Sequence, residues 1–260
     1  MRALDIAATG MQAQNTTVEV IANNIANMST TGFKRSRAEF QDLMYENLRG
    51  VGSSSSSSSI VPAGAQIGLG VKTAAIYRIA SQGNLQQTGN ALDLAINGAG
   101  YFQITLPDGE TAYTRDGTFS LAPDGTIVTA DGYTVQPGIT VPTNATAITI
   151  SPAGQVQATI AGQTAPQSLG TLQLATFPNE AGLAAQGGNL FLQSAASGSP
   201  VTGPPAAAGF GTVLQGFVES SNVTVVTEIT NLISAQRAYE MNSRVITSAD
   251  NMLNTLTQIG

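Results

Sequence analysis

Cysteine and histidine are both absent from this 260-residue sequence. Their absence excludes disulfides, thiolate nucleophiles, imidazole bases and zinc sites built from these residues. Positive charge is also scarce, because 10 Lys and Arg residues stand against 16 Asp and Glu residues, for a formal net charge of −6. Electrostatic binding of nucleic acid needs a basic surface, so nucleic-acid partners are nearly excluded. We expect the small basic cluster of Lys34, Arg35 and Arg37 to be a solvated patch beyond a helix end.

Charged residues of either sign make up only 10% of the chain, where about 25% is usual. A surface with so little charge repels copies of itself weakly and suits self-association. Long apolar runs are missing too, since nothing approaches the roughly 18 residues of a membrane span and no apolar stretch suits a cleaved signal peptide. We therefore expect no membrane insertion, and any export must follow a route that reads another signal.

Proline is missing from both ends, because all 11 prolines lie between Pro62 and Pro205. Within these ends apolar residues recur at every seventh position. Such a heptad stripe predicts helices that pack along a shared seam. The predicted helix-pairing core consists of Leu4, Met11, Val18, Ile25, Val225, Leu232, Tyr239, Ile246 and Leu253.

The pattern predicts one helix from Ala3 to about Met28, ended by a turn in which Gly32 supplies left-handed geometry. A second helix is predicted from Glu228 to about Thr257. The β-branched run at 223–227 resists helix, so the first turns should depend on packing. Both helices carry Asn, Gln, Ser and Thr on their outer faces in place of Glu–Lys pairs, which makes burial against another chain less costly.

A second zone covers residues 35–66. Phe40, Leu43, Met44 and Leu48 have helical spacing, and seven consecutive serines follow within 50–59. A serine run predicts a flexible linker. The alternative is a segment ordered only by contacts in an assembly.

The middle of the chain reads as β structure. Four Asp-Gly pairs predict tight hairpins about eight residues apart, at Asp108, Asp116, Asp124 and Asp131. Strands are predicted at 101–106, 126–129, 147–150, 155–160 and 169–177. The fold class is therefore α+β, with long N- and C-terminal helices that pair as a coiled coil around an inserted β-rich domain. The predicted parts are a helix in 1–34, an extended serine-rich linker at 35–66, a β-rich domain at 67–216 and a C-terminal helix in 217–260.

The aspartates of the middle offer paired carboxylates or calcium ligands in principle. Four of the five (Asp93 is the exception) directly precede glycine and serve as turn formers. The spacing of an EF-hand is absent, and no base other than carboxylates exists. We therefore expect no catalysis, no metal and no cofactor.

Several segments resemble the bacterial flagellar rod and hook protein family. They are GMQAQ from Gly10, VIANNIAN from Val20, TGFK from Thr31, SQGNL from Ser81, YTRDG from Tyr113, SNV from Ser221 and QRAYEMN from Gln236. The likeness covers nearly the whole chain. Length and the zone after the first helix resemble the distal-rod members most, although the segment at about 47–64 is dominated by serine here.

The resemblance implies a structural homopolymer of the flagellar basal body. Subunits stack helically into a rigid hollow shaft that transmits motor torque to the hook, with the terminal helices inside and the β domain outside. Members pass unfolded through the flagellar export apparatus, without a cleaved signal peptide, and assemble in the periplasm. The implied partners are further copies, other rod proteins, the hook protein and the surrounding rings.

On this interpretation six polar side chains of the helices are candidates for contacts between subunits: Asn23, Asn24, Asn27, Gln236, Arg237 and Asn242. The alternative is that they form a solvated helix surface. A proximal rod or hook subunit is the nearest alternative function, and a secreted non-enzymatic binding module is one of another class. A cell-wall hydrolase lacks candidate chemistry, because the aspartates are turn formers.

Overall fold

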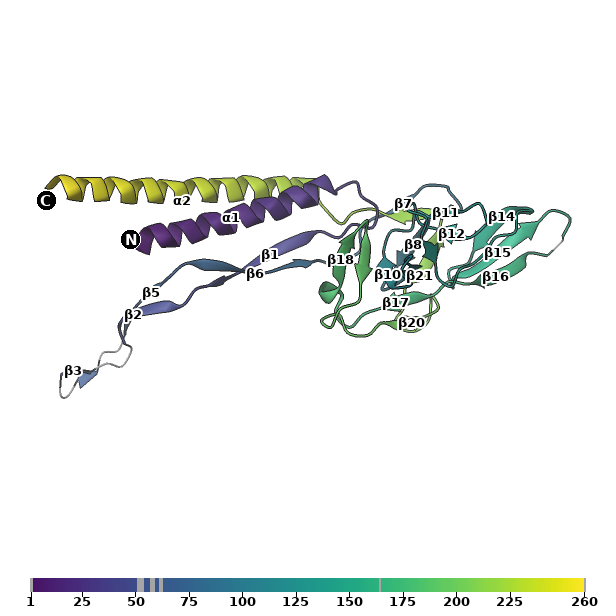
Figure 1. Ribbon diagram of the computed structural model, residues 1–260, viewed down its shortest axis with the longest axis horizontal. Helices are drawn as coiled ribbons and strands as arrows, with labels where there is room; N and C mark the ends of the chain where they lie inside the picture. The colour runs from purple at the N-terminus through teal and green to yellow at the C-terminus, as the bar shows by residue number, and fades with distance from the viewer. Residues whose placement is uncertain (1, 51–53, 57–58, 61–62, 164, 260) are drawn as a thin grey trace. The chain divides into compact units, whose positions relative to one another are not determined.

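The computed structural model describes residues 2–50, 54–56, 59–60, 63–163 and 165–259 (Figure 1). The chain forms two compact units. The helix unit contains the chain up to Ile25, Ser36–Tyr77 and the chain from Thr224, and the β unit contains Ala26–Arg35 and Arg78–Val223. The architecture is α+β, with N- and C-terminal helices flanking a β-rich region.

The helix unit contains two long helices and a chain of short strands. Helix α1 covers Arg2–Ala26 and helix α2 covers Val225–Ile259, while the strands are β1 (Ser36–Asp42), β2 (Tyr45–Arg49), β3 (Ser54–Ser56), β4 (Ser59–Ile60), β5 (Ala65–Gly68) and β6 (Val71–Arg78). Strand β1 pairs with β6, β2 with β5 and β3 with β4. Residues 65–77 therefore belong to the helix unit. The sequence predicted instead that the β-rich domain begins at residue 67.

The segment with helical spacing at Phe40, Leu43, Met44 and Leu48 is not a helix. It forms β1 and β2, because an antiparallel partner that lies far along the chain satisfies its backbone groups, as in the pairing of Tyr45 with Gly68. The prediction for the serine run falls partly on 51–53, 57–58 and 61–62, which lie outside the described residues.

Helix α2 begins at Val225, three residues before the predicted start, so Val225, Val226 and Thr227 of the β-branched run are helical, whereas Val223 and Thr224 are not. The Glu228 amide donates to the Thr224 carbonyl at 3.0 Å and closes the first turn. Helix α1 ends at Ala26, and Gly32 has a φ of +69° in the connection that follows. Among the described residues, neither helix has an apolar stretch long enough to cross a membrane.

The described residues of the β unit form two sheets of different size and two further strand pairs. Its strands are β7 (Leu85–Gln87), β8 (Leu94–Asn97), β9 (Tyr101–Thr105), β10 (Thr111–Thr114), β11 (Ser120–Leu121), β12 (Ile127–Val128), β13 (Thr134–Val135), β14 (Ala145–Ile150), β15 (Gln155–Ile160), β16 (Gln167–Thr171), β17 (Leu174–Thr176), β18 (Ala184–Gly187), β19 (Leu190–Leu192), β20 (Val201–Gly203), β21 (Thr212–Gln215) and β22 (Phe217–Glu219). A short 3-10 helix lies at Glu180–Gly182.

The largest sheet has nine strands in the order β11-β12-β13-β9-β10-β19-β18, with β17 pairing to both β9 and β20. Strands β14, β15 and β16 form a separate sheet, and β21 pairs with β8 and β22 with β7. The predicted strand at 169–177 is broken between β16 and β17, because these two strands belong to different sheets. The core gathers around Phe102, whose ring meets that of Phe119 edge to face at 5.1 Å between centroids.

Three of the four predicted Asp-Gly hairpins are confirmed. Gly109, Gly125 and Gly132 have φ values of +87°, +82° and +85° in the turns between successive antiparallel strands. The prediction for Asp116-Gly117 is wrong, because β10 and β11 do not pair there. A Cβ on Gly117 would lie 1.6 Å from the Leu94 carbonyl oxygen, so this glycine permits close packing of two backbones.

Candidate assembly surfaces

The helix unit holds α1 and α2 together through small and polar residues. The Asn24 side-chain amide donates to Glu228 Oε2 at 3.3 Å, and a Cβ on Gly10 would lie 2.8 Å from Asn242 Nδ2. The residue order of these two contacts is opposite on the two helices, so the helices run antiparallel. The buried residues of the pair are Ala7, Ala13, Ile21, Asn24, Glu228, Ala235 and Ala249.

The predicted pairing residues lie next to this buried line. Tyr239 and Val225 are exposed, at 46% and 37% of their surface. The others are half-buried: Leu4, Met11, Val18, Ile25, Leu232, Ile246 and Leu253. The sequence also predicts that Ala235 and Ala249 supplement the heptad positions of α2, and both are buried. Sequence reasoning missed that Glu228 and Asn242 complete a second heptad with them, because polar residues give no apolar signal.

The six predicted contact residues differ in exposure. Asn24 is 1% exposed, and its side chain accepts from the Ser36 amide at 2.8 Å and donates to the Ser36 carbonyl at 2.9 Å. Its polar atoms are therefore used within the chain. Asn242 is half-buried beside Gly10, and Asn27 is half-buried and accepts from the Thr30 hydroxyl. The exposed members are Asn23, Gln236 and Arg237.

Helix α2 carries a second apolar line, which we call the outer stripe. Its members are spaced by three, four, seven or eight residues and are all exposed: Val226, Ile229, Ile233, Met241, Val245 and Met252. At about 100° of rotation per residue, they lie mostly on the face away from Glu228, Ala235 and Ala249. A second exposed apolar group lies on β2 and the residue before it, where Met44 is 81% exposed and Tyr45 and Leu48 are also open to solvent.

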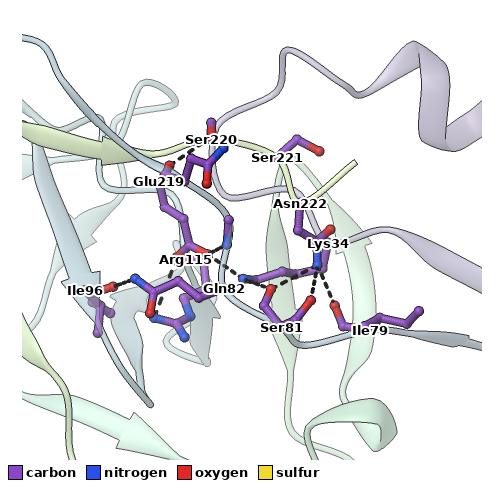
Figure 2. Close-up of polar contacts among 12 residues, drawn as sticks. Lys34, Ile79, Ser81, Gln82, Ile96, Arg115, Glu219, Ser220, Ser221 and Asn222 are labelled. Carbon is purple, nitrogen blue, oxygen red and sulfur yellow. Dashed lines mark hydrogen bonds and ion pairs between the residues drawn. The ribbon is translucent and has the colours of Figure 1, made fainter. Parts of the chain in front are cut away.

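The β unit contains a buried charge cluster where residues near both ends of the chain meet (Figure 2). Lys34 Nζ donates to Glu219 Oε1 at 2.5 Å and to the Ser81 carbonyl at 2.9 Å. Arg115 Nη1 lies 3.7 Å from Glu219 Oε2, and Arg115 Nη2 donates to the Gly98 carbonyl at 2.7 Å. Burial lowers the pKa of Lys34 below its usual range, and the hydrogen bond and charge of Glu219 oppose that effect.

This cluster corrects the expectation of a solvated basic patch. Lys34 is only 3% exposed, Arg35 is half-buried and Arg37 alone is exposed. The Asn222 side chain accepts from the Arg35 amide at 2.7 Å and donates to the Ile79 and Ser81 carbonyls. No group of three or more acidic residues suited to a metal ion occurs in the part of the chain that the structure describes.

Comparison with known proteins assigns these features to one family. Residues 4–34 match a family described as flagella basal body rod protein, 95–158 match the flagellar hook protein FlgE/F/G D1 domain, and 214–259 match the flagellar basal body rod FlgEFG protein C-terminal region. The flagellar basal-body rod protein FlgG of Caulobacter vibrioides is 58% identical over 100% of this chain and 99% of its own length.

Two further relatives extend the likeness. FlgG of Agrobacterium fabrum is 55% identical over 99% of both chains, and FlgG of Bacillus subtilis is 40% identical over 100% of this chain and 99% of its own length. These identities cover both helices, the ribbon of β1–β6 strands and the β unit. The chain belongs to the flagellar basal-body rod protein family.

Proposed function

We propose that this chain is the structural subunit of the flagellar distal rod, and that copies of it assemble into a rigid hollow helical shaft that transmits motor torque to the hook. The full-length identity to FlgG proteins supports this role. It is not an enzyme. The rod spans the periplasm, and the chain reaches it through the flagellar export apparatus without a cleaved signal peptide. Its neighbours there are other rod proteins, the hook protein and the rings around the rod.

The outer stripe is the observation that best supports self-assembly. Six large apolar side chains stay exposed on α2, most of them on the face away from its buried residues, although α1 already contacts the same helix. Burial of apolar surface stabilises association at about 25 cal/mol per Å². Exposed apolar patches of this kind mark protein interaction sites. A second copy of the chain covers the outer stripe in the rod.

Within each subunit α1 and α2 pair as an antiparallel coiled coil. The half-buried heptad residues flank the buried small residues and add apolar contacts on both sides of the seam. Asn23, Gln236 and Arg237 are exposed on these helices and supply polar contacts between copies. Neutral amides suit such contacts because they lose less hydration energy than charges do on burial.

Sedimentation and negative-stain images of the concentrated protein test this proposal. We expect rings or filaments from the parent chain, and fewer or none from Ile233→Gln, which makes the middle of the outer stripe polar. Leu121→Gln is the matched control, because it also replaces an exposed apolar residue by an amide but lies on β11. A parent chain that stays monodisperse at every concentration would favour a secreted binding module.

A further inference from the structure

A ten-residue segment, Ala26–Arg35, belongs to the β unit although α1 before it and β1 after it belong to the helix unit. We call this segment the strap. The chain thus leaves the helix unit, contacts the β unit over a short distance and returns. A segment with this path can detach without breaking any strand pairing of the β unit, because it contributes no strand to those sheets.

The strap backbone is held at several points by the β unit. The Gly32 amide donates to the Glu219 carbonyl at 2.7 Å, and the Asn189 side chain donates to the Thr31 carbonyl at 3.0 Å. The Asn222 side chain accepts from the Arg35 amide, and the Asn222 amide donates to the Phe33 carbonyl at 3.4 Å. Gly32 also fits tightly, since a Cβ there would lie 2.7 Å from the Asp116 amide nitrogen. Only the residue without a side chain fits this position at a φ of +69°.

Lys34 is the one strap side chain whose charge is buried in the β unit. It enters a socket whose other members do not belong to the strap (Figure 2). Glu219 Oε1 accepts from Lys34 Nζ and also from the Gly83 amide at 2.8 Å, while Arg115 lies on the opposite side of the carboxylate. Without Lys34, Glu219 and Arg115 still form a pair with no net charge. The socket can therefore persist when the strap is absent.

We propose that the strap is a detachable clasp on the β unit, and that Lys34 is the pin that holds it in the socket formed by Glu219, Arg115 and the Ser81 carbonyl. Removal of the Glu219 charge leaves the buried ammonium of Lys34 without its partner, and truncating one member of a buried pair is strongly destabilising. Arg115 loses the same carboxylate but keeps its hydrogen bond to the Gly98 carbonyl at 2.7 Å. The clasp then opens while the β core stays folded. This inference concerns a single subunit and does not depend on rod assembly.

The chain has only two lysines, so their relative reactivity reports whether the strap is docked. Lys34 is the buried pin, and Lys72 is exposed on β6. We would acylate the soluble full-length chain with an N-hydroxysuccinimide ester and follow each lysine by mass spectrometry. We expect Lys34 to react at least about tenfold more slowly than Lys72 in the parent chain. In Glu219→Gln the two rates should come within about twofold of each other. Glu110→Gln, an exposed carboxylate of the β unit, is the matched control and should leave Lys34 protected.

Hydrogen exchange of β9 in the same samples shows whether the β core remains folded. Asn222→Ala is a second variant, which removes the bonds to Arg35, Ile79 and Ser81 without changing any charge, and it should also expose Lys34. Equal reactivity of Lys34 and Lys72 in the parent chain would show that the strap is not docked. Continued protection of Lys34 in both variants would show that Lys34 does not hold the strap in the socket. Loss of β9 protection together with Lys34 protection would show that the cluster holds the whole β unit, so the clasp is not detachable.

Discussion

At the scale of single residues, identical Asp-Gly dipeptides have different structural roles. Asp108-Gly109 and Asp116-Gly117 read alike in the sequence, yet one makes a solvated turn and the other lets two backbones meet. Gly109 has a φ of +87° and open space around its Cα, whereas Gly117 faces the Leu94 carbonyl. Their substitution should therefore have very different consequences.

We predict that Gly117→Ala destabilises the β unit by about 3 kcal/mol or more, because a methyl group there overlaps backbone that cannot move cheaply. Gly109→Ala should cost only about 1 kcal/mol, since only its left-handed backbone is strained. Urea midpoints followed by circular dichroism give both values. Equal midpoints for the two variants would contradict this explanation of Gly117.

Tyr101 makes the stability of the β unit sensitive to alkali. Burial, followed by the charge of Glu180, raises the pKa of Tyr101 far above its usual value, and its hydroxyl donates to Glu180 Oε2 at 3.2 Å. The folded protein keeps this proton while the unfolded chain loses it above a pH of about 10. Stability from Tyr101 is therefore complete below that pH and declines above it.

We predict that the free energy of unfolding falls between pH 9 and pH 11. In Tyr101→Phe the slope of this fall should be smaller by the equivalent of about one proton released on unfolding. Urea titrations at several pH values measure the slope. Tyr133→Phe serves as the control. If Tyr101→Phe and the parent chain have the same slope, the buried hydroxyl is not the group responsible.

At the scale of elements, the two helices depend on what covers them. Ile21 is the only large apolar residue among the buried described residues of the seam between α1 and α2, and the others are Ala, Asn and Glu, so apolar stabilisation within one chain is modest. Leu232 lies half-buried between Glu228 and Ala235, which are both buried. A change at this position tests the contribution of the helix pair without touching the β unit.

We predict that Leu232→Asp abolishes rod assembly and motility, because it places a charge on the partly apolar seam at a cost of about several kcal/mol in every subunit. Leu232→Met, which keeps volume and hydrophobicity, should stay motile. Motility and the yield of basal bodies give the result, with the circular dichroism of the β unit as a check on folding. A motile Leu232→Asp strain at normal expression would contradict the seam assignment.

At the scale of the whole molecule, a single copy leaves much apolar surface uncovered. The outer stripe and the exposed residues Met44, Tyr45 and Leu48 require a neighbour. An isolated two-stranded ribbon is only marginally stable in water, and a helix gains little without a packed face. Order in the helix unit should therefore depend on assembly.

We predict that residues 3–28 exchange their amide protons rapidly in a dilute monomer and slowly in the polymer. Hydrogen exchange with mass spectrometry compares them with β9 in the same chain. The β unit is the internal control, since its core is complete within one copy. Protection of residues 3–28 equal to that of β9 in the monomer would contradict the prediction.

We also predict that deletion of residues 47–64 leaves export and helix pairing intact but yields curved rods, because we propose that this segment reaches a neighbouring subunit in the rod and resists bending. Part of it lies outside the described residues. Replacement of the serines by other small polar residues should matter much less, since reach rather than hydroxyl chemistry is the proposed role. Electron micrographs measure the curvature of the rods. Straight rods after the deletion would show that the segment is a passive linker.

The sequence by itself determined the features that depend on local patterns. Proline-free heptads predicted both helices within a few residues, and three Asp-Gly pairs marked their hairpins, because helix periodicity and turn conformation are properties of neighbouring residues. The family motifs predicted membership, which the relatives of 58% and 55% identity confirm.

Only the tertiary structure decided which residues meet across long separations. It placed Lys34 against Glu219, turned Asn24 inward onto Ser36, and paired β1 with β6 and β2 with β5, despite the helical spacing of the segment that forms β1 and β2. Lys34 is buried and Lys72 is exposed, although both have the same letter in the sequence. Their difference comes from desolvation and from partners that folding brings together from distant positions, which no local pattern contains.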